Sequence, residues 1–217
     1  MHKMIRSAYL RAVFVAVFVA VFVAACAPAA AGTLSASVTD AGGAPIADAV
    51  IYAVALGATP AVAPRPAIMD QVNKEYLPLV VPVQVGAAVT FPNKDNIRHQ
   101  VYSFSPAKVF ELKLYAGTPA KPVVFDKPGA VVLGCNIHDW MVGYIYVVDT
   151  PYFAKTGKAG AARLEALPAG DYEVRVWHPY MKAEAALLTL KLAAGATADA
   201  SFRVELSAPQ KVPPAGK

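Results

Sequence analysis

The sequence predicts an all-β protein with sheets packed as a sandwich or barrel, preceded by a signal peptide. Apolar residues alternate with polar ones near the start of the mature chain, as at Leu34, Ala36 and Val38, which is typical of half-buried strands. Further on, short β-branched and aromatic segments follow one another, separated by Gly, Pro, Asn and Asp. Apart from the amino-terminal segment, no stretch shows the 3.6-residue apolar stripe of a helix.

The amino-terminal segment has the composition of an export signal. It carries Lys3, Arg6 and Arg11 and no acidic residue, and then an unbroken Ala/Val/Phe run of 14 residues, Ala12–Ala25. That length suits the apolar core of a signal peptide and falls short of the roughly 20 residues that a transmembrane helix needs. We therefore expect residues 1–31 to be a signal peptide and the mature protein to be periplasmic.

Two processing routes fit this segment. Ala29-Ala30-Ala31 is a small-residue cleavage site that would release a soluble chain beginning at Gly32, and this route is favoured. Val23-Ala24-Ala25-Cys26 resembles a bacterial lipobox, which would leave Cys26 lipidated and the protein attached to a membrane. Both routes stay open from the sequence.

The charge of the mature chain does not indicate nucleic-acid binding. Loss of the three basic residues of the signal peptide reduces 20 basic residues to 17, against 15 acidic ones. The mature chain has no basic run and no interleaved aromatic stripe.

The chain between residues 32 and 64 contains two expected strands and a linker. Alternating apolar residues predict strands at residues 34–38 and 50–56, joined by a turn over 40–45 with the sequence DAGGAP. Pro60 and Pro64 follow, with Pro66 just beyond, and prolines at this density are typical of a linker.

Residues 65–149 are expected to form a domain of their own. Its short segments are rich in β-branched and aromatic residues and are regularly spaced, as in a sandwich or barrel. The predicted strands are Leu77–Val85, Ala87–Phe91, His99–Phe104, Val109–Leu114, Val123–Phe125, Ala130–Cys135 and Tyr144–Val148.

The character of the chain changes again over residues 150–206. Strands are expected in residues 163–178, 187–192 and 200–206. The last segment, 207–217, contains Pro209, Pro213 and Pro214 and is expected to be disordered.

Metal-ligating residue types gather at one spacing near the middle of the chain. Cys135, His138 and Met141 form a Cys-x2-His-x2-Met motif, and His99 lies upstream on a polar loop. Two His, one Cys and a weak axial Met are the ligand set of a mononuclear electron-transfer copper site. Once Cys26 is removed or acylated, Cys135 is a lone cysteine and cannot form an internal disulfide.

This motif predicts how copper would be held. His99, Cys135 and His138 would form a trigonal plane, and Met141 would lie on the axis at longer range. Cys135 would bind as a thiolate, because a bound metal lowers the pKa of a thiol. A rigid β framework would let one copper ion change oxidation state with little rearrangement.

The middle domain resembles the cupredoxins. The resemblance rests on VTFPN at residues 89–93, FDKPG at 125–129 and the Cys-x2-His-x2-Met loop, which is most similar to those of amicyanin and pseudoazurin. Together with HQVYSFS at 99–105, the segment also resembles proteins called methylamine utilisation protein. The resemblance implies a Greek-key sandwich with one type 1 copper. It also implies redox-protein partners, with a c-type cytochrome as one candidate.

The resemblance also implies an electron entry point and shows one departure. Electrons would enter through the exposed edge of His138, with Trp140 and residues 151–153 as an apolar rim; a core position for Trp140 is the alternative. Many cupredoxins have an aromatic residue just before the ligand Cys, where this chain has Gly134.

The flanking segments resemble a second family. VTD at 38–40, PIADAV at 45–50 and LPAGDY at 167–172 are similar to carboxypeptidase regulatory-like, or transthyretin-like, sandwiches. Since these motifs lie on both sides of the middle domain, the resemblance implies a cupredoxin domain inserted into, or joined to, a small transthyretin-like sandwich.

Three other functions fit the sequence less well. A copper enzyme would need further histidines, and His178 is the one left over after processing, so no catalytic residues are assigned. A copper carrier or chaperone would favour clustered methionines or paired cysteines, whereas Met69, Met141 and Met181 are dispersed. A non-redox binding module would function without Cys135.

Overall fold

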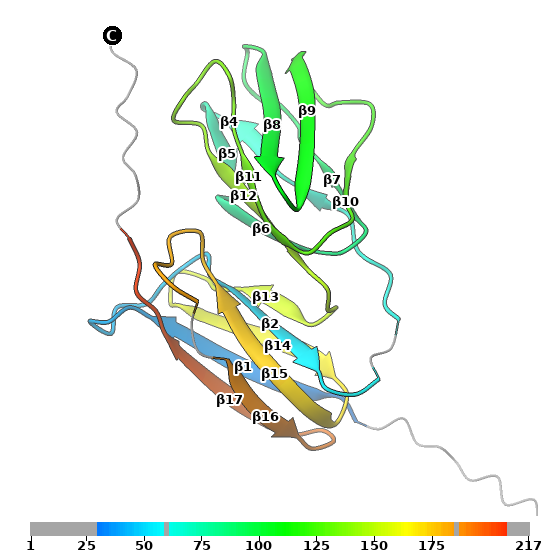
Figure 1. The fold of residues 1–217 in the computed structure, drawn as a ribbon, viewed down its shortest axis with the longest axis vertical. Helices are drawn as coiled ribbons and strands as arrows, with labels where there is room; N and C mark the ends of the chain where they lie inside the picture. The colour runs from blue at the N-terminus through cyan, green and yellow to red at the C-terminus, as the bar shows by residue number, and fades with distance from the viewer. Residues whose placement is uncertain (1–29, 59–60, 185–186, 208–217) are drawn as a thin grey trace, which may run out of the picture.

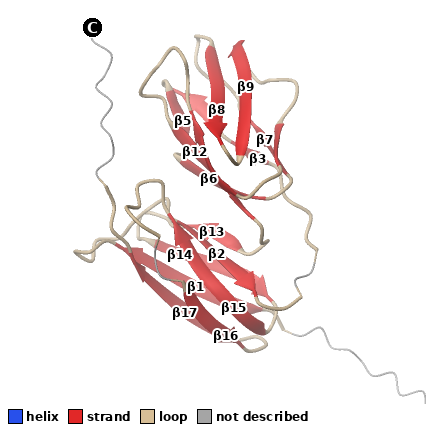
Figure 2. Ribbon diagram, viewed as in Figure 1, coloured by secondary structure: helices blue, strands red, loops and turns tan. Residues whose placement is uncertain are grey.

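The computed structural model describes residues 30–58, 61–184 and 187–207, and all the regular structure in these ranges is strand (Figure 2). The predicted signal peptide up to residue 29, with Cys26, and the tail from residue 208 lie outside the described residues. Two sandwiches stack along the long axis of the molecule (Figure 1). Within the described ranges, no helix has the length and apolar character needed to cross a bilayer.

The flanking sandwich combines strands from both ends of the described chain. Its two sheets have the strand orders β14-β1-β17 and β13-β2-β15-β16. Side chains such as Leu34, Ile51 and Val174, each 0% exposed, form one core between them. The strands are β1 (Gly32–Thr39), β2 (Val50–Ala55), β13 (Phe153–Lys155), β14 (Ala161–Leu167), β15 (Gly170–Trp177), β16 (Leu188–Leu192) and β17 (Thr197–Arg203).

The inserted sandwich has its own core, which contains Phe91, Phe125 and Ile145. One face pairs strands in the order β10-β7-β3; the other contains β11-β12-β6 and the hairpin β8-β9, which a bridge between Tyr102 and Gly134 joins to β11. The strands are β3 (Ala67–Ile68), β4 (Asp70–Val72), β5 (Glu75–Leu77), β6 (Val80–Gln84), β7 (Ala87–Thr90), β8 (His99–Ser105), β9 (Lys108–Tyr115), β10 (Val123–Phe125), β11 (Gly129–Leu133) and β12 (Gly143–Val148).

The predicted fold class, all-β with one sandwich inserted in another, is confirmed. The chain leaves the flanking sandwich after β2, builds β3 to β12, and returns as β13, which pairs with β2 (Figure 1). The two sandwiches therefore have separate cores, and their strands are not mixed.

One predicted strand is wrong. Residues 77–85 were expected to be continuous, but β5 ends at Leu77 and β6 begins at Val80. Pro78 lies in the break, and proline lacks the N–H that a strand interior would donate. Pro82 is tolerated inside β6 because β6 is the edge strand of β11-β12-β6.

An aromatic seam joins the two sandwiches. The ring of Tyr146 on β12 stacks on Trp177 of β15, with centroids 4.2 Å apart and planes 12° apart. The hydroxyls of Tyr146 and Tyr52 lie 3.3 Å apart, and Tyr144 meets Tyr180 edge-on at 6.1 Å. Such pairs contribute about 0.5–1.5 kcal/mol each beyond their buried area, so the seam restrains one sandwich against the other.

Candidate metal centre

Three of the four predicted ligands converge in the inserted sandwich. One ligand atom from each of His99, Cys135 and His138 lies within 4.8 Å of the others. Cys135 Sγ is 3.8 Å from His99 Nδ1 and 3.8 Å from His138 Nδ1. All three residues are buried. They surround a point that one metal ion can occupy with both imidazoles bound through Nδ1.

His99 is held by its other ring nitrogen. It is the first residue of β8, at the end of the inserted sandwich that lies away from the flanking sandwich (Figure 1). His99 Nε2 lies 2.7 Å from Asp95 Oδ2, and the same carboxylate accepts backbone hydrogen bonds from Asn73 (2.6 Å) and Lys74 (2.8 Å). Since Nε2 is engaged, Nδ1 faces Cys135 and is free to ligate. Such carboxylate–histidine pairs orient metal ligands.

The hydrogen bonds to Asp95 also keep it ionised. Burial alone would raise the pKa of Asp95, but hydrogen bonds from the backbone of Lys74, from His99 and from the backbone of Asn73 outweigh burial and lower the pKa below its usual value. A carboxylate in this state is a strong acceptor for the N–H of a ligating imidazole.

Asn93 fixes the loop that carries Asp95. Its amide nitrogen donates to the carbonyls of Ile97 (2.8 Å) and Tyr115 (2.9 Å), and its Oδ1 accepts from the backbone N–H of Asp95 at 3.0 Å. Asn96 lies on the same loop as Asn93. The structure favours bracing for Asn93, which is buried, whereas Asn96 is exposed.

The loop after β11 supplies the other ligands. The backbone N–H of Met141 donates to His138 O at 2.9 Å, which closes a turn and returns the chain toward Cys135. The pKa of His138 is lowered by burial first, and then by the neighbouring charges of His99 and Lys74. A lowered pKa favours the neutral imidazole, which is the form that binds a metal.

Met141, the fourth predicted ligand, is 1% exposed and belongs to the same core as Cys135. The two residues also line one hollow of about 320 Å³. Met141 therefore lies in the same part of the core as Cys135, on the loop that also carries His138.

Two tyrosines near Cys135 were not predicted from the sequence to lie there. Tyr76 donates its hydroxyl to the carbonyl of Gly134 (3.0 Å), and burial raises its pKa well above the ordinary value. Tyr102 packs its ring over Gly134: a Cβ placed there would lie 2.6 Å from Tyr102 Cζ. The aromatic residue expected just before the ligand cysteine is therefore replaced by one from the neighbouring strand.

Asp95 was not predicted as the partner of His99 either. Its position four residues before His99, on a polar loop, is a sequence signal that could have identified it. For Tyr76 and Tyr102 no sequence signal exists, because the contact depends on pairing between β8 and β11 and on the β4-β5 hairpin.

The predicted apolar rim is only partly present. Trp140 is half-buried, and its ring lies 5.1 Å from that of His138. Tyr152, by contrast, belongs to the core of the flanking sandwich and Phe153 pairs with Tyr52 in β13, so residues 151–153 do not surround the metal centre. The rim prediction is wrong there because the chain turns into the other sandwich directly after β12.

His178, the histidine left over from the predicted ligand set, is buried in the flanking sandwich. Its Nδ1 accepts the backbone N–H of Tyr180 at 3.2 Å, and burial lowers its pKa. It lies outside the cluster of His99, Cys135 and His138.

The donor set fits copper. A thiolate and a thioether suit Cu(I), and imidazole suits both Cu(I) and Cu(II). The side chains that supply these donors are buried and tied to strands or to a hydrogen-bonded loop. A donor set held in this way would suit a metal ion that changes oxidation state.

No protein-family model matches the chain, and no curated protein matches it. Solved structures similar to it include a copper-containing nitrite reductase from Thermus scotoductus SA-01 (29% identity, 44% of this chain and 25% of that one, TM-score 0.37). Others are a purple cupredoxin from Nitrosopumilus maritimus (27%, 37% and 96%, TM-score 0.33) and an amicyanin in its reduced Cu(I) form (21%, 45% and 99%, TM-score 0.36). The match spans a quarter of the nitrite reductase.

Proposed function

We propose that this protein is an electron carrier with one type 1 copper, held by His99, Cys135, His138 and Met141. The observation that carries the proposal is the buried convergence of two imidazole nitrogens and one sulfur within 4.8 Å. Bound copper would supply a one-electron couple between Cu(I) and Cu(II). The cupredoxin resemblance of residues 65–149 supports the same reading.

The protein's own residues set the conditions for rapid electron transfer. Asp95 and Asn93 hold His99 in one orientation, and the turn from His138 to Met141 fixes the remaining loop. Because these contacts hold the side chains within the protein, we expect little rearrangement when the metal changes oxidation state. His138 is 9% exposed and lies against Trp140, which offers one short route to the surface.

We place the carrier in the periplasm, on the strength of the signal-like segment before residue 32 and of the resemblance to methylamine utilisation proteins. We also place it among electron carriers rather than enzymes. Within the described ranges, His178 is the histidine outside the cluster, and its Nδ1 already accepts a backbone hydrogen bond. The flanking sandwich, which resembles transthyretin-like domains, would act as a rigid support.

The direct test is to express residues 32–217, add one equivalent of Cu(II) and record optical and electron paramagnetic resonance spectra. An intense thiolate-to-copper absorption with a narrow copper hyperfine splitting is the expected result. A colourless protein, or one with an ordinary tetragonal copper signal, would refute the proposed site.

Asp95→Asn is expected to weaken copper binding about 10- to 100-fold, the usual cost of losing the partner of a ligating histidine. The asparagine amide is neutral and has a single oxygen. It therefore cannot accept the two backbone N–H groups and also give His99 a charged acceptor. Competition titrations with a chelator measure the affinity. Asp139→Asn is the matched control, because Asp139 is exposed on the ligand loop; equal affinities for the two variants would contradict the role of Asp95.

Met141→Leu is expected to retain copper and to raise the reduction potential. Leucine fills the same buried space but lacks the weak thioether donor. The thioether stabilises Cu(II) more than an apolar group does, so its loss raises the reduction potential. Voltammetry measures the change. Met69→Leu, at a 0% exposed position of the same core, should leave the potential unchanged; a similar shift in both variants would mean that core packing, not ligation, sets it.

A further inference from the structure

Tyr76 contacts the backbone beside two of the segments that carry proposed ligands. It lies on β5 and is 2% exposed. Its hydroxyl donates to the carbonyl of Gly134 (3.0 Å), the residue before Cys135, and to the carbonyl of Gln100 (3.3 Å), the residue after His99. Since a tyrosine hydroxyl has one proton, the two carbonyls share it. One side chain thus joins the backbone next to Cys135 to the backbone next to His99.

The other end of the Tyr76 side chain packs on the strand that follows the ligand loop, residues 134–142. Gly143 is the first residue of β12, two residues after Met141. A Cβ placed on Gly143 would lie 2.7 Å from Cβ and 2.9 Å from Cγ of Tyr76, so the absence of a side chain allows this approach. Gly143 also pairs with Leu133, the last residue of β11. Tyr76 therefore lies across the base of the ligand loop, where β11 ends and β12 begins.

The hairpin that carries Tyr76 also holds the partner of His99. β4 and β5 are joined by a two-residue turn at Asn73 and Lys74, whose φ values of 55° and 63° are typical of tight hairpin turns. The backbone N–H groups of both turn residues donate to the carboxylate of Asp95. Asp95 in turn engages Nε2 of His99. The same hairpin therefore reaches the ligand loop at one end and His99 at the other.

The β4-β5 hairpin is itself fixed to the loop that leads into β8. Gln71, 0% exposed on β4, donates its backbone N–H to the carbonyl of Pro92 at 2.9 Å and accepts the backbone N–H of Lys94 at 2.9 Å. Lys94 Nζ lies 2.7 Å from Asp70 Oδ2. None of these contacts uses an atom of a proposed ligand, so they can fix the hairpin before a metal binds.

We propose that Tyr76 is a positioning residue for the copper site, which fixes the ligand loop relative to His99 before the metal binds. This inference rests on the proposed function. Tyr76 acts through the backbone groups beside the ligands. A donor set arranged in advance moves little when copper binds or changes oxidation state, which favours rapid electron transfer.

The test replaces Tyr76 by phenylalanine and begins without metal. Phenylalanine keeps the ring and removes the hydroxyl, so the variant should fold. Its amide hydrogen exchange is followed by NMR. Exchange of the Met141 N–H, which closes the turn to His138 O, is expected to be about tenfold faster in metal-free Tyr76→Phe than in the unaltered protein.

The second measurement is electron self-exchange between copper-loaded copies of the same variant. One copy is oxidised from Cu(I) to Cu(II) while another is reduced from Cu(II) to Cu(I), so no other reactant is needed. NMR line broadening in mixtures of the two forms gives the rate. Because Tyr76 is buried, the surface is unaltered and the rate reports on the metal site. We expect Tyr76→Phe to slow self-exchange about tenfold, as loss of a group that orients metal ligands does.

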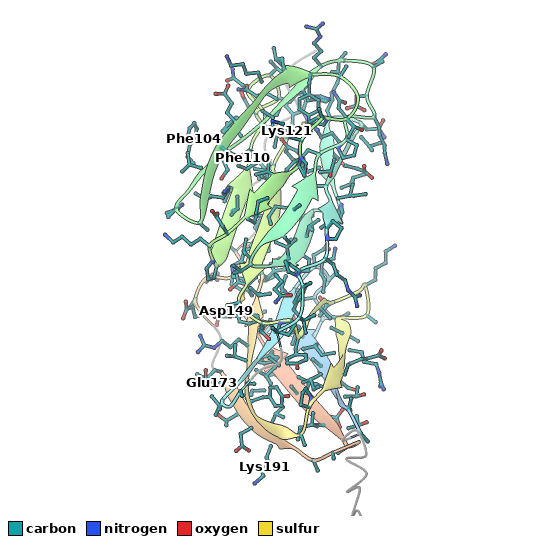
Figure 3. All side chains as sticks on the ribbon, turned by 90° about the vertical axis from the view of Figure 1, so that its right-hand side faces the viewer. Phe104, Phe110, Lys121, Asp149, Glu173 and Lys191 are labelled. Carbon is teal, nitrogen blue, oxygen red and sulfur yellow. The ribbon has the colours of Figure 1, made fainter. Side chains whose placement is uncertain are left out.

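Tyr172→Phe is the matched control. Tyr172 is also 2% exposed and donates its hydroxyl to a backbone carbonyl, that of Pro168, at 2.8 Å. It lies on β15 in the flanking sandwich, where Figure 3 labels the next residue, Glu173. This variant should leave both the exchange of the Met141 N–H and electron self-exchange unchanged.

The two measurements separate the role of Tyr76 from the proposed function. Unchanged exchange of the Met141 N–H in Tyr76→Phe would overturn the proposal, and so would equal effects of the two tyrosine variants. Faster amide exchange with an unchanged rate of self-exchange would make Tyr76 a structural residue only, which also overturns it. If the unaltered protein lacks the expected copper spectrum, the proposed function fails, whereas the metal-free comparison still tests whether Tyr76 fixes the loop.

Discussion

Cys135→Ser is expected to abolish the intense absorption that copper would give with this protein, and electron transfer with it. The absorption requires a thiolate bound to Cu(II), and serine at neutral pH offers only a neutral hydroxyl. Cys135 is 3% exposed, and its sulfur lies 3.8 Å from the Nδ1 atoms of both His99 and His138. The thioether of Met141 would not take over the trigonal position, because it is only a weak donor.

The variant should remain folded, because serine is smaller than cysteine and Cys135 forms no disulfide among the described residues. Optical spectra of the copper-loaded variant measure the loss, and circular dichroism checks the fold. His178→Gln is the matched control: it alters a buried histidine outside the cluster and should keep the absorption. An unchanged absorption in Cys135→Ser would disprove the ligand set and would favour a function that does not use this cysteine.

Three of the proposed ligands could be predicted from the sequence because their spacing is local. A Cys-x2-His-x2-Met motif brings its members together through one loop, whatever strands surround it. His99 is 36 residues away from Cys135, and it could be assigned only because polar loops at strand ends are where such sandwiches place ligands. The structure brings His99 into the same cluster as Cys135 and His138.

The surroundings of the ligands could not be predicted in the same way. The carboxylate of Asp95 meets His99 only because the backbone of the β4-β5 turn, at Asn73 and Lys74, holds it there. Tyr102 covers Gly134 only because β8 pairs with the end of β11. Contacts of this kind depend on strand pairing across the domain, and the periodicity of one segment contains no information about its partner.

The short strands were missed for a related reason. β4, β5 and β13 have three residues each, too few to show an alternating pattern, and none has the run of β-branched and aromatic residues that predicted the equally short β10. They form because a neighbour is already in place: β13 pairs with β2, which the chain left before it entered the inserted sandwich. The insertion itself followed from motifs on both sides of residues 65–149, and it explains why residues 151–153 lie far from the ligands.

Gly160→Ala is expected to destabilise the flanking sandwich strongly. Gly160 has a φ of +68°, and a Cβ there would lie 2.5 Å from Val38 O and 3.0 Å from Ile46 N, which are backbone atoms that cannot move aside. A non-glycine residue in this conformation costs about 1–3 kcal/mol, and overpacking a buried site costs about as much again. We expect the free energy of unfolding of this sandwich to fall by about 3 kcal/mol or more.

Gly157→Ala is the control in the same turn, since a Cβ at Gly157 has no neighbour within 4 Å. Its denaturation midpoint, measured by far-ultraviolet circular dichroism, should stay close to that of the unaltered protein, while that of Gly160→Ala falls. Because the inserted sandwich has its own core, copper-loaded Gly160→Ala should keep its absorption at temperatures where the flanking strands have unfolded. Equal midpoints for the two variants would contradict the close approach of β1 to this turn. Loss of the absorption together with the flanking strands would mean that the seam of Tyr146 and Trp177 makes the two sandwiches one cooperative unit.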